Sequence, residues 1–175
     1  MFLLMVTGKG VVVPDQPSLG VLLFLPYRHL EDRVLAAVHA AGHPITLAQA
    51  RVFARVDAGG SRLTRLARSA QVTKQTAGYL VDQLEEQGYL ERTPDPVDAR
   101  ARLVRITAKG LEVIAVAVPV QAAVEAEWAE RLGPRGTTQL REALLALREL
   151  TDPYAAPTSS SNPRARLRRH HARSR

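Results

Sequence analysis

The sequence from residue 63 to residue 90 reads LTRLARSAQVTKQTAGYLVDQLEEQGYL. Two sets of apolar residues within it repeat at i, i+3, i+4 and i+7, which is the spacing of one helix face. They are Leu63, Leu66, Ala67 and Ala70, followed by Ala77, Leu80, Val81 and Leu84. Thr73 is placed to cap the second helix, and Gly88 is typical of the position just past a helix end. The stretch therefore predicts two short helices joined by a tight turn.

The hydrophobic period changes after this helix pair. Residues 89–92 are predicted to form a short strand, and residues 93–100, with two prolines and two aspartates, form a turn-rich loop. Residues 102–106 follow a period of two, as a returning antiparallel strand should. A helix pair followed by a β-hairpin with a basic tip predicts a winged helix-turn-helix.

Helical spacing also precedes this unit. Residues 22–41 carry apolar side chains at close to helical intervals, and Gly42 ends that run. Thr46 and Gln49 have the spacing of a capping box, which predicts the start of another helix. We expect that helix to end at the Gly59-Gly60 pair.

Further helices are predicted after the hairpin. Thr107 is placed to cap a long helix that runs to about residue 132, with Pro119 as a kink or an accommodated bend. Gly133-Pro134 separates it from a last helix that ends near residue 150. The expected fold class is mainly α with a small β-wing.

Length and charge suggest one domain with two arms. The 175 residues carry a formal net charge of +7, but residues 157–175 contain six arginines and no acidic residue. The other 156 residues therefore carry only +1. We expect a flexible N-terminal arm over residues 1–20, a domain over residues 21–152 and a disordered basic tail over residues 153–175.

Several classes of protein and site are excluded or disfavoured by the sequence. The chain has no cysteine, which excludes disulfides, thiolate metal sites and thiol redox sensors. No uncharged apolar run approaches the roughly 18 residues of a membrane span, and the apolar N-terminus lacks the basic start and cleavage site of a signal peptide. No catalytic arrangement or phosphate-binding glycine loop stands out. We expect a cytoplasmic, non-enzymatic protein with no cofactor, no metal and no membrane partner.

The exposed face of the second helix carries candidate DNA-binding residues. With the apolar face buried, that exposed face presents Thr73, Lys74, Gln75, Thr76, Gly78, Tyr79 and Asp82. Hydroxyl, ammonium and amide groups beside a helix N-terminus suit phosphates and base edges in the major groove. A glycine at position 78 can be explained in two ways. It would allow the helix to approach the DNA groove closely, or it would allow a neighbouring helix to pack closely.

The hairpin tip and the preceding helix add basic candidates. A tip arginine such as Arg100 can enter a minor groove, and Asp98 could hold its guanidinium in a bidentate pair, with Arg102 nearby. Arg62 and Arg65 could contact phosphates. A solvated turn and a solvated helix face are the respective alternatives.

These motifs, in order and spacing, resemble the MarR family of bacterial transcriptional regulators. The likeness covers residues 63–110, and the flanking helices extend it to about residues 22–150. It is carried by Leu63-Thr64-x-Leu66-Ala67, Val72-Thr73-Lys74-Gln75-Thr76, Leu84-Glu85-x-x-Gly88-Tyr89-Leu90-Glu91-Arg92, Asp95-Pro96-x-Asp98-x-Arg100 and Ile106-Thr107-x-x-Gly110.

The resemblance implies a sequence-specific regulator that binds double-stranded DNA as a homodimer. Residues 22–42 and 108–150 would form interlocked dimerisation helices, and residues 46–107 the DNA-binding lobe. Residues 73–76 would begin the recognition helix, and Arg100 would be the wing-tip arginine with Asp98 as its partner. The expected function is a repressor that an aromatic or lipophilic small-molecule effector releases from a palindromic operator.

Other interpretations remain open. A winged-helix protein–protein interaction module without specific DNA binding would be favoured by acidic residues on the recognition face, where Asp82 and Glu86 lie late in the helix. The arginine-rich tail could by itself bind nucleic acid non-specifically. His39 and His43 have a spacing that can bind a metal, but Gly42 interrupts the helix between them.

Overall fold

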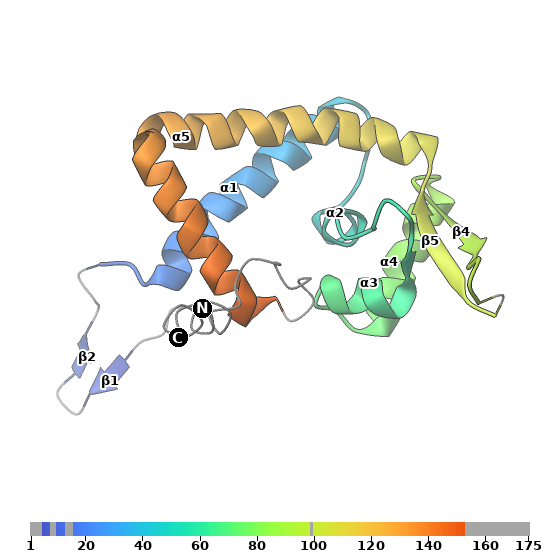
Figure 1. Ribbon diagram of the computed structural model, residues 1–175, viewed down its shortest axis with the longest axis horizontal. Helices are drawn as coiled ribbons and strands as arrows, with labels where there is room; N and C mark the ends of the chain where they lie inside the picture. Colours follow the sequence, from blue (N-terminus) through green and yellow to red (C-terminus); the bar gives the residue numbers. More distant parts are fainter. Residues whose placement is uncertain (1–4, 8–9, 13–15, 99, 153–175) are drawn as a thin grey trace, which may run out of the picture. The chain divides into compact units, whose positions relative to one another are not determined.

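The computed structural model describes residues 5–7, 10–12, 16–98 and 100–152 (Figure 1). The expected basic tail over residues 153–175 lies outside the described residues. The chain divides into two compact units, Met1–Ala126 and Glu127–Arg175, and each is described by itself.

The first unit contains several helices and two small antiparallel sheets. Its elements are β1 (Met5–Thr7), β2 (Gly10–Val12), α1 (Leu19–Ala40), α2 (Leu47–Phe53), β3 (Ser61–Arg62), α3 (Leu63–Ser69), α4 (Lys74–Glu86), β4 (Leu90–Pro94), β5 (Arg102–Ile106) and the start of α5 (Ala108–Thr151). The wing is an antiparallel three-stranded sheet in the order β3-β5-β4. Its strands β4 and β5 are labelled in Figure 1. The mainly helical fold with a small β-wing is confirmed.

The predicted helix faces form the core. Ala77, Leu80, Val81 and Leu84 of α4 are all buried. Leu80, Val81 and Leu84 pack in one core cluster with Leu66 of α3, Tyr89 and Leu90 at the start of the hairpin, and Val104 of β5, among others. The i, i+3, i+4, i+7 spacing thus marked the buried face of α4, which leaves its other face for a partner.

The first helices and the N-terminal segment differ from the expectation. The segment expected as an arm contains the β1–β2 hairpin, and α1 begins at Leu19, where the hydroxyl of Ser18 accepts the N–H of Val21 at 3.4 Å. The capping box at Thr46 and Gln49 is confirmed, but α2 ends at Phe53 rather than at Gly59-Gly60.

A local turn follows α2 and precedes β3. The hydroxyl of Ser61 accepts the N–H of Asp57 at 3.0 Å and donates to the carboxylate of Asp57 at 2.9 Å. Such side-chain bonds compete with helix continuation. The turn delivers Ser61 to pair with Val104, and so adds the strand β3, which the sequence did not predict.

The last helix begins against the hairpin. The hydroxyl of Thr107 donates to the carbonyl of Gly88 at 2.6 Å and accepts the N–H of Gly110 at 3.1 Å, so Thr107 caps α5 as predicted. Pro119 lies within regular helix. In the second unit the helix is interrupted at Gly133, which has φ 69° and ψ 170°, as the Gly-Pro pair predicted. Within the described ranges, no helix has both the length and the apolar character needed to cross a membrane.

Candidate nucleic-acid interface

The N-terminus of α4 presents a compact group of polar side chains. The Thr73 hydroxyl accepts the N–H of Thr76 at 3.0 Å, and the two threonine hydroxyls lie 2.8 Å apart. Lys74 and Gln75 follow on the same exposed turn. The turn before Thr73 is closed by Gln71 at φ 55°. The structure therefore brings together the four residues predicted to begin the recognition helix.

The next turn of α4 presents Gly78 and Tyr79. Tyr79 is 62% exposed, and its hydroxyl accepts a hydrogen bond from the side-chain amide of Gln83 at 2.9 Å. A Cβ added at Gly78 would lie 3.7 Å from Cδ2 of Leu63, an ordinary van der Waals distance. Packing against α3 therefore does not require glycine here.

We expect a Gly78→Ala variant to be more stable than the unmodified chain by about 0.5–1 kcal/mol, because glycine is unfavourable inside a helix. If the helix approaches DNA closely here, the same variant should bind its DNA target more weakly despite its greater stability. Urea unfolding and DNA titration of the same preparation measure the two effects. Tighter or unchanged DNA binding would contradict a close approach at Gly78.

The wing is attached to the start of α3 through Arg62. Its guanidinium binds Oδ2 of the buried Asp95, with Nε at 2.8 Å and Nη2 at 2.6 Å. The other Asp95 oxygen accepts the N–H of Val97 at 2.9 Å. The Val97 N–H and then Arg62 hold the pKa of Asp95 below its usual range. Arg62, predicted as a phosphate contact, is thus engaged in holding the β4–β5 loop.

The wing tip differs from the expected arrangement. Asp98 accepts the backbone N–H of Arg100 at 3.1 Å, and its other oxygen lies 3.8 Å from Nη2 of Arg62. The expected bidentate pair with the Arg100 guanidinium is therefore wrong. The turn instead fixes the Arg100 backbone and leaves its side chain exposed.

A basic hollow lies between α4 and the wing. It is lined by Arg62, Leu63, Thr64, Lys74, Arg92, Ala101, Arg102 and Val104. Arg92 is ion-paired with Glu85 and, at 2.5 Å, with Asp82. Within the described part of the chain, Lys74 and Arg102 have no carboxylate partner. The hollow therefore has two positively charged side chains, those of Lys74 and Arg102, that can bind a phosphate of the DNA backbone.

The sequence did not predict Arg92 as part of this surface. It predicted Arg65 as a phosphate contact, but Arg65 has an acidic partner. Arg92 lies on β4 and forms ion pairs with Asp82 and Glu85 of α4, and no local spacing indicates such a contact. Arg65 is 72% exposed in its side chain but is paired with Asp57, with Nε and Oδ2 3.3 Å apart.

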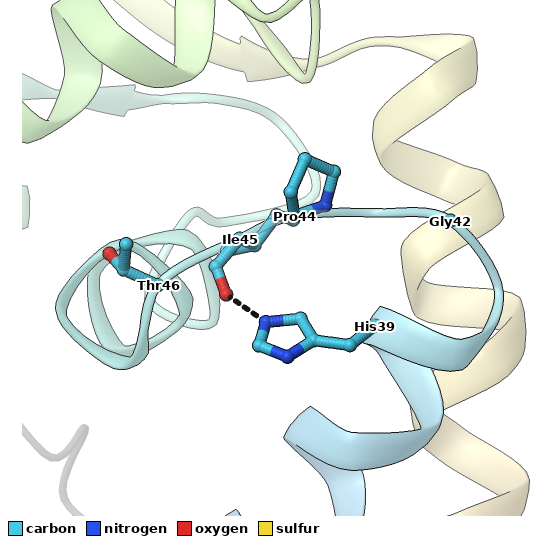
Figure 2. A pocket seen from close by; sticks show the side chains of 5 residues that line it. All are labelled: His39, Gly42, Pro44, Ile45 and Thr46. Carbon is cyan, nitrogen blue, oxygen red and sulfur yellow. Dashed lines mark hydrogen bonds between the residues drawn. The ribbon is translucent and has the colours of Figure 1, made fainter.

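A second hollow lies at the α1–α2 connection (Figure 2). It is lined by His39, Gly42, Pro44, Ile45 and Thr46, and Nε2 of His39 lies 2.7 Å from the carbonyl oxygen of Ile45. His43 is buried, and its Nδ1 lies 3.4 Å from the hydroxyl of Tyr89. The two histidines thus have separate partners, and no metal-binding group of three His, Asp or Glu side chains occurs among the described residues.

Comparisons with known proteins find similarity over part of the chain. A family model described as the MarR family matches residues 33–101. The transcriptional regulator HosA of Escherichia coli O111:H- is 34% identical over 76 residues, which are 43% of this chain and 56% of HosA. The match thus spans little more than half the length of this curated relative.

Solved structures share the fold over more of the chain. The transcriptional regulator Tm0710 from Thermotoga maritima is 29% identical with a TM-score of 0.53, covering 75% of this chain and 92% of that one. CouR from Rhodococcus jostii RHA1, bound to p-coumaroyl-CoA, is 23% identical with a TM-score of 0.63, covering 79% and 95%. The second likeness concerns the fold alone.

Proposed function

We propose that this chain is a member of the MarR family and a non-enzymatic DNA-binding transcriptional regulator that acts in the bacterial cytoplasm. The match of residues 33–101 to the MarR family model and the 34% identity with HosA over 76 residues support this proposal. In this proposal it binds a palindromic operator as a homodimer and represses transcription until a small-molecule effector releases it.

The observation that carries the proposal is the surface formed by α4 and the wing. The exposed first turn of α4 offers hydroxyl, ammonium and amide groups beside a helix N-terminus, which suit a major groove. Lys74 and Arg102 line the hollow next to it, and Arg100 is exposed at the wing tip. One lobe thus offers contacts for a major groove, a phosphate and a minor groove.

The proposal of a homodimer is supported by apolar side chains that a single chain leaves exposed. The start of α1 exposes a group of large hydrophobic residues, namely Leu19, Leu22, Leu23, Phe24 and Leu25. Contiguous apolar patches of this kind typically mark interaction sites. A second copy of the chain is the partner that a palindromic operator requires, because the symmetry of the protein then matches that of the DNA.

The proposal of an effector is supported by two observations. CouR, which shares this fold, was solved with p-coumaroyl-CoA bound. In this chain, the hollow at the α1–α2 connection is lined by Pro44, Ile45 and His39, and the imidazole of His39 faces the carbonyl oxygen of Ile45 (Figure 2). That lining suits an aromatic or lipophilic molecule with one polar group.

The alternative of a winged-helix protein-interaction module finds less support. An acidic recognition face would favour it. Of the two acids expected on that face, Asp82 is ion-paired with Arg92, and Glu86 is the last residue of α4. The part of α4 nearest the wing hollow carries Lys74 and no acidic side chain.

We expect the full-length chain to bind a duplex from upstream of its own coding sequence at least about a thousand-fold more tightly than a shuffled duplex at equal salt. A chain ending at residue 156 should keep this preference. Because it lacks six arginines per chain, the slope of log affinity against log salt should decrease by up to about five per chain. Fluorescence-anisotropy titrations at several salt concentrations measure both quantities.

The same titrations can contradict the proposal. Equal affinity of the 175-residue chain for the two duplexes would show that it does not bind DNA sequence-specifically. Loss of all binding on truncation at residue 156 would instead assign the nucleic-acid affinity to the tail alone.

A further inference from the structure

A continuous series of hydrogen bonds connects the start of α2 with the exposed face of α4. The backbone N–H of Thr46 donates to Oε1 of Gln49 at 2.8 Å. The side-chain amide of Gln49 donates to Oε1 of Gln83 at 3.2 Å, and that of Gln83 donates to the hydroxyl of Tyr79 at 2.9 Å. The series thus ends on a side chain of the proposed DNA-binding surface.

The direction of every bond in this series follows from its first member. A backbone N–H can only donate, so the atom of Gln49 that faces Thr46 has to be its carbonyl oxygen. The NH₂ group of Gln49 then faces Gln83, which has to present its own carbonyl oxygen in return. The NH₂ group of Gln83 is therefore directed at Tyr79, whose hydroxyl oxygen accepts.

This direction decides the chemistry of the exposed hydroxyl. A phenol has one hydrogen to donate, and the bond from Gln83 occupies an oxygen lone pair rather than that hydrogen. The hydrogen of the Tyr79 hydroxyl is thus free for a partner outside the chain. Gln49 is only 2% exposed and closes the capping box of α2, so the inner end of the series is fixed within the core.

We propose that Tyr79 is a specificity-determining residue that donates a hydrogen bond to an acceptor on a base edge, and that Gln83 and Gln49 are the residues that position it. In the major groove such acceptors are N7 of either purine, O6 of guanine and O4 of thymine. The amino groups of cytosine and adenine are donors, and Tyr79 would discriminate against them. This inference rests on the proposed function, because it requires α4 to lie in the major groove.

The experiment starts with selection of bound duplexes from a library by the full-length chain, with about 20 randomised base pairs to span two half-sites. Affinities for a selected and a scrambled duplex are then measured for the unmodified chain, Tyr79→Phe, Gln83→Met and the double variant. We expect each single variant to reduce the ratio of the two affinities about three- to ten-fold, the value of one hydrogen bond. The double variant should lose no more than Tyr79→Phe alone.

Substitution of each base pair in the selected duplex then identifies the acceptor. For the unmodified chain, one position per half-site should favour a base with an acceptor at the contacted edge, and Tyr79→Phe should lose that preference. A duplex in which a 7-deazapurine replaces the purine at this position tests N7 directly.

Two control variants match the chemical changes elsewhere. Tyr27→Phe removes the hydroxyl of a tyrosine that is hydrogen-bonded to Glu31 on α1. Gln121→Met removes an exposed glutamine that donates to Glu125 on the same helix at 3.0 Å. Both residues lie on helices proposed for dimerisation, so sedimentation of each control should first show the same oligomeric state as the unmodified chain. The affinity ratio should then be unchanged, and thermal unfolding should show that all variants are folded.

Each remaining result counts against the inference in a distinguishable way. If the unmodified chain selects no duplex, the proposed function fails and this inference fails with it. If selection succeeds but Tyr79→Phe weakens both duplexes equally, the hydroxyl contacts a phosphate and does not determine specificity. If Gln83→Met keeps the full ratio, or its effect adds to that of Tyr79→Phe, Gln83 does not position Tyr79.

Discussion

A Gly110→Ala variant is expected to lose about 1–3 kcal/mol of its free energy of unfolding, because a methyl group at this position has no space. An added Cβ would lie 2.4 Å from the carbonyl oxygen of Tyr89, 2.7 Å from Cγ2 of Ile106 and 3.2 Å from Cε2 of Phe53. The carbonyl of Tyr89 cannot easily move away, since it accepts hydrogen bonds from the backbone and the hydroxyl of Thr107.

Urea unfolding followed by circular dichroism measures this loss. Gly20→Ala is the matched control, because a Cβ at Gly20 on α1 would meet only Oγ of Ser18, at 3.9 Å. The control should be as stable as the unmodified chain or more so. If Gly110→Ala unfolds at the same urea concentration as the control, the close approach of α5 to Tyr89 is incorrect.

An Arg100→Ala variant should bind the selected duplex roughly ten-fold more weakly, a change of about 1.4 kcal/mol, with its melting temperature unchanged. The side chain is exposed, so its removal costs the fold little. A guanidinium at a wing tip gains its affinity from the negative potential of a narrow minor groove. Anisotropy titration with the selected duplex measures the loss.

The control for Arg100 is another exposed arginine of the same lobe. Arg55→Ala removes an equal charge at the end of α2, near Tyr27 of α1. We expect Arg55→Ala to change affinity by less than two-fold, and Arg100→Lys to give an intermediate loss. Equal losses for Arg100→Ala and Arg55→Ala would show that only net charge matters and that the wing tip makes no specific contact.

Local sequence signals predicted most of the fold. The spacing of Ala77, Leu80, Val81 and Leu84, the capping box at Thr46 and the break at Gly133 each concern residues within one or two turns of each other. The strand β3 could not be predicted in this way. It consists of two residues, and it exists because Ser61 is fixed by Asp57 and paired with Val104, 43 positions further along the chain.

The same distinction between local sequence signals and contacts distant in sequence applies to the candidate site. The exposed turn that begins at Thr73 could be placed from helix geometry alone, because an apolar face on one side defines a polar face on the other. The ion-pair partners of the charged side chains around it could not be predicted. The pairs Arg62–Asp95 and Arg92–Asp82 each join residues of different elements. The contact of Gln49 with Gln83 joins α2 to α4 and likewise has no local signal.

The hydrogen bonds of Thr107 also limit how this lobe can be exchanged with that of another protein. Its hydroxyl and N–H bind the carbonyls of Gly88 and Tyr89, and Gly110 fits against the second of these. A chimeric protein joined at the end of β5 would place a foreign helix start against these carbonyls and leave them without donors. A transplanted lobe therefore has to include the first turn of α5, and a workable junction lies beyond Gly110.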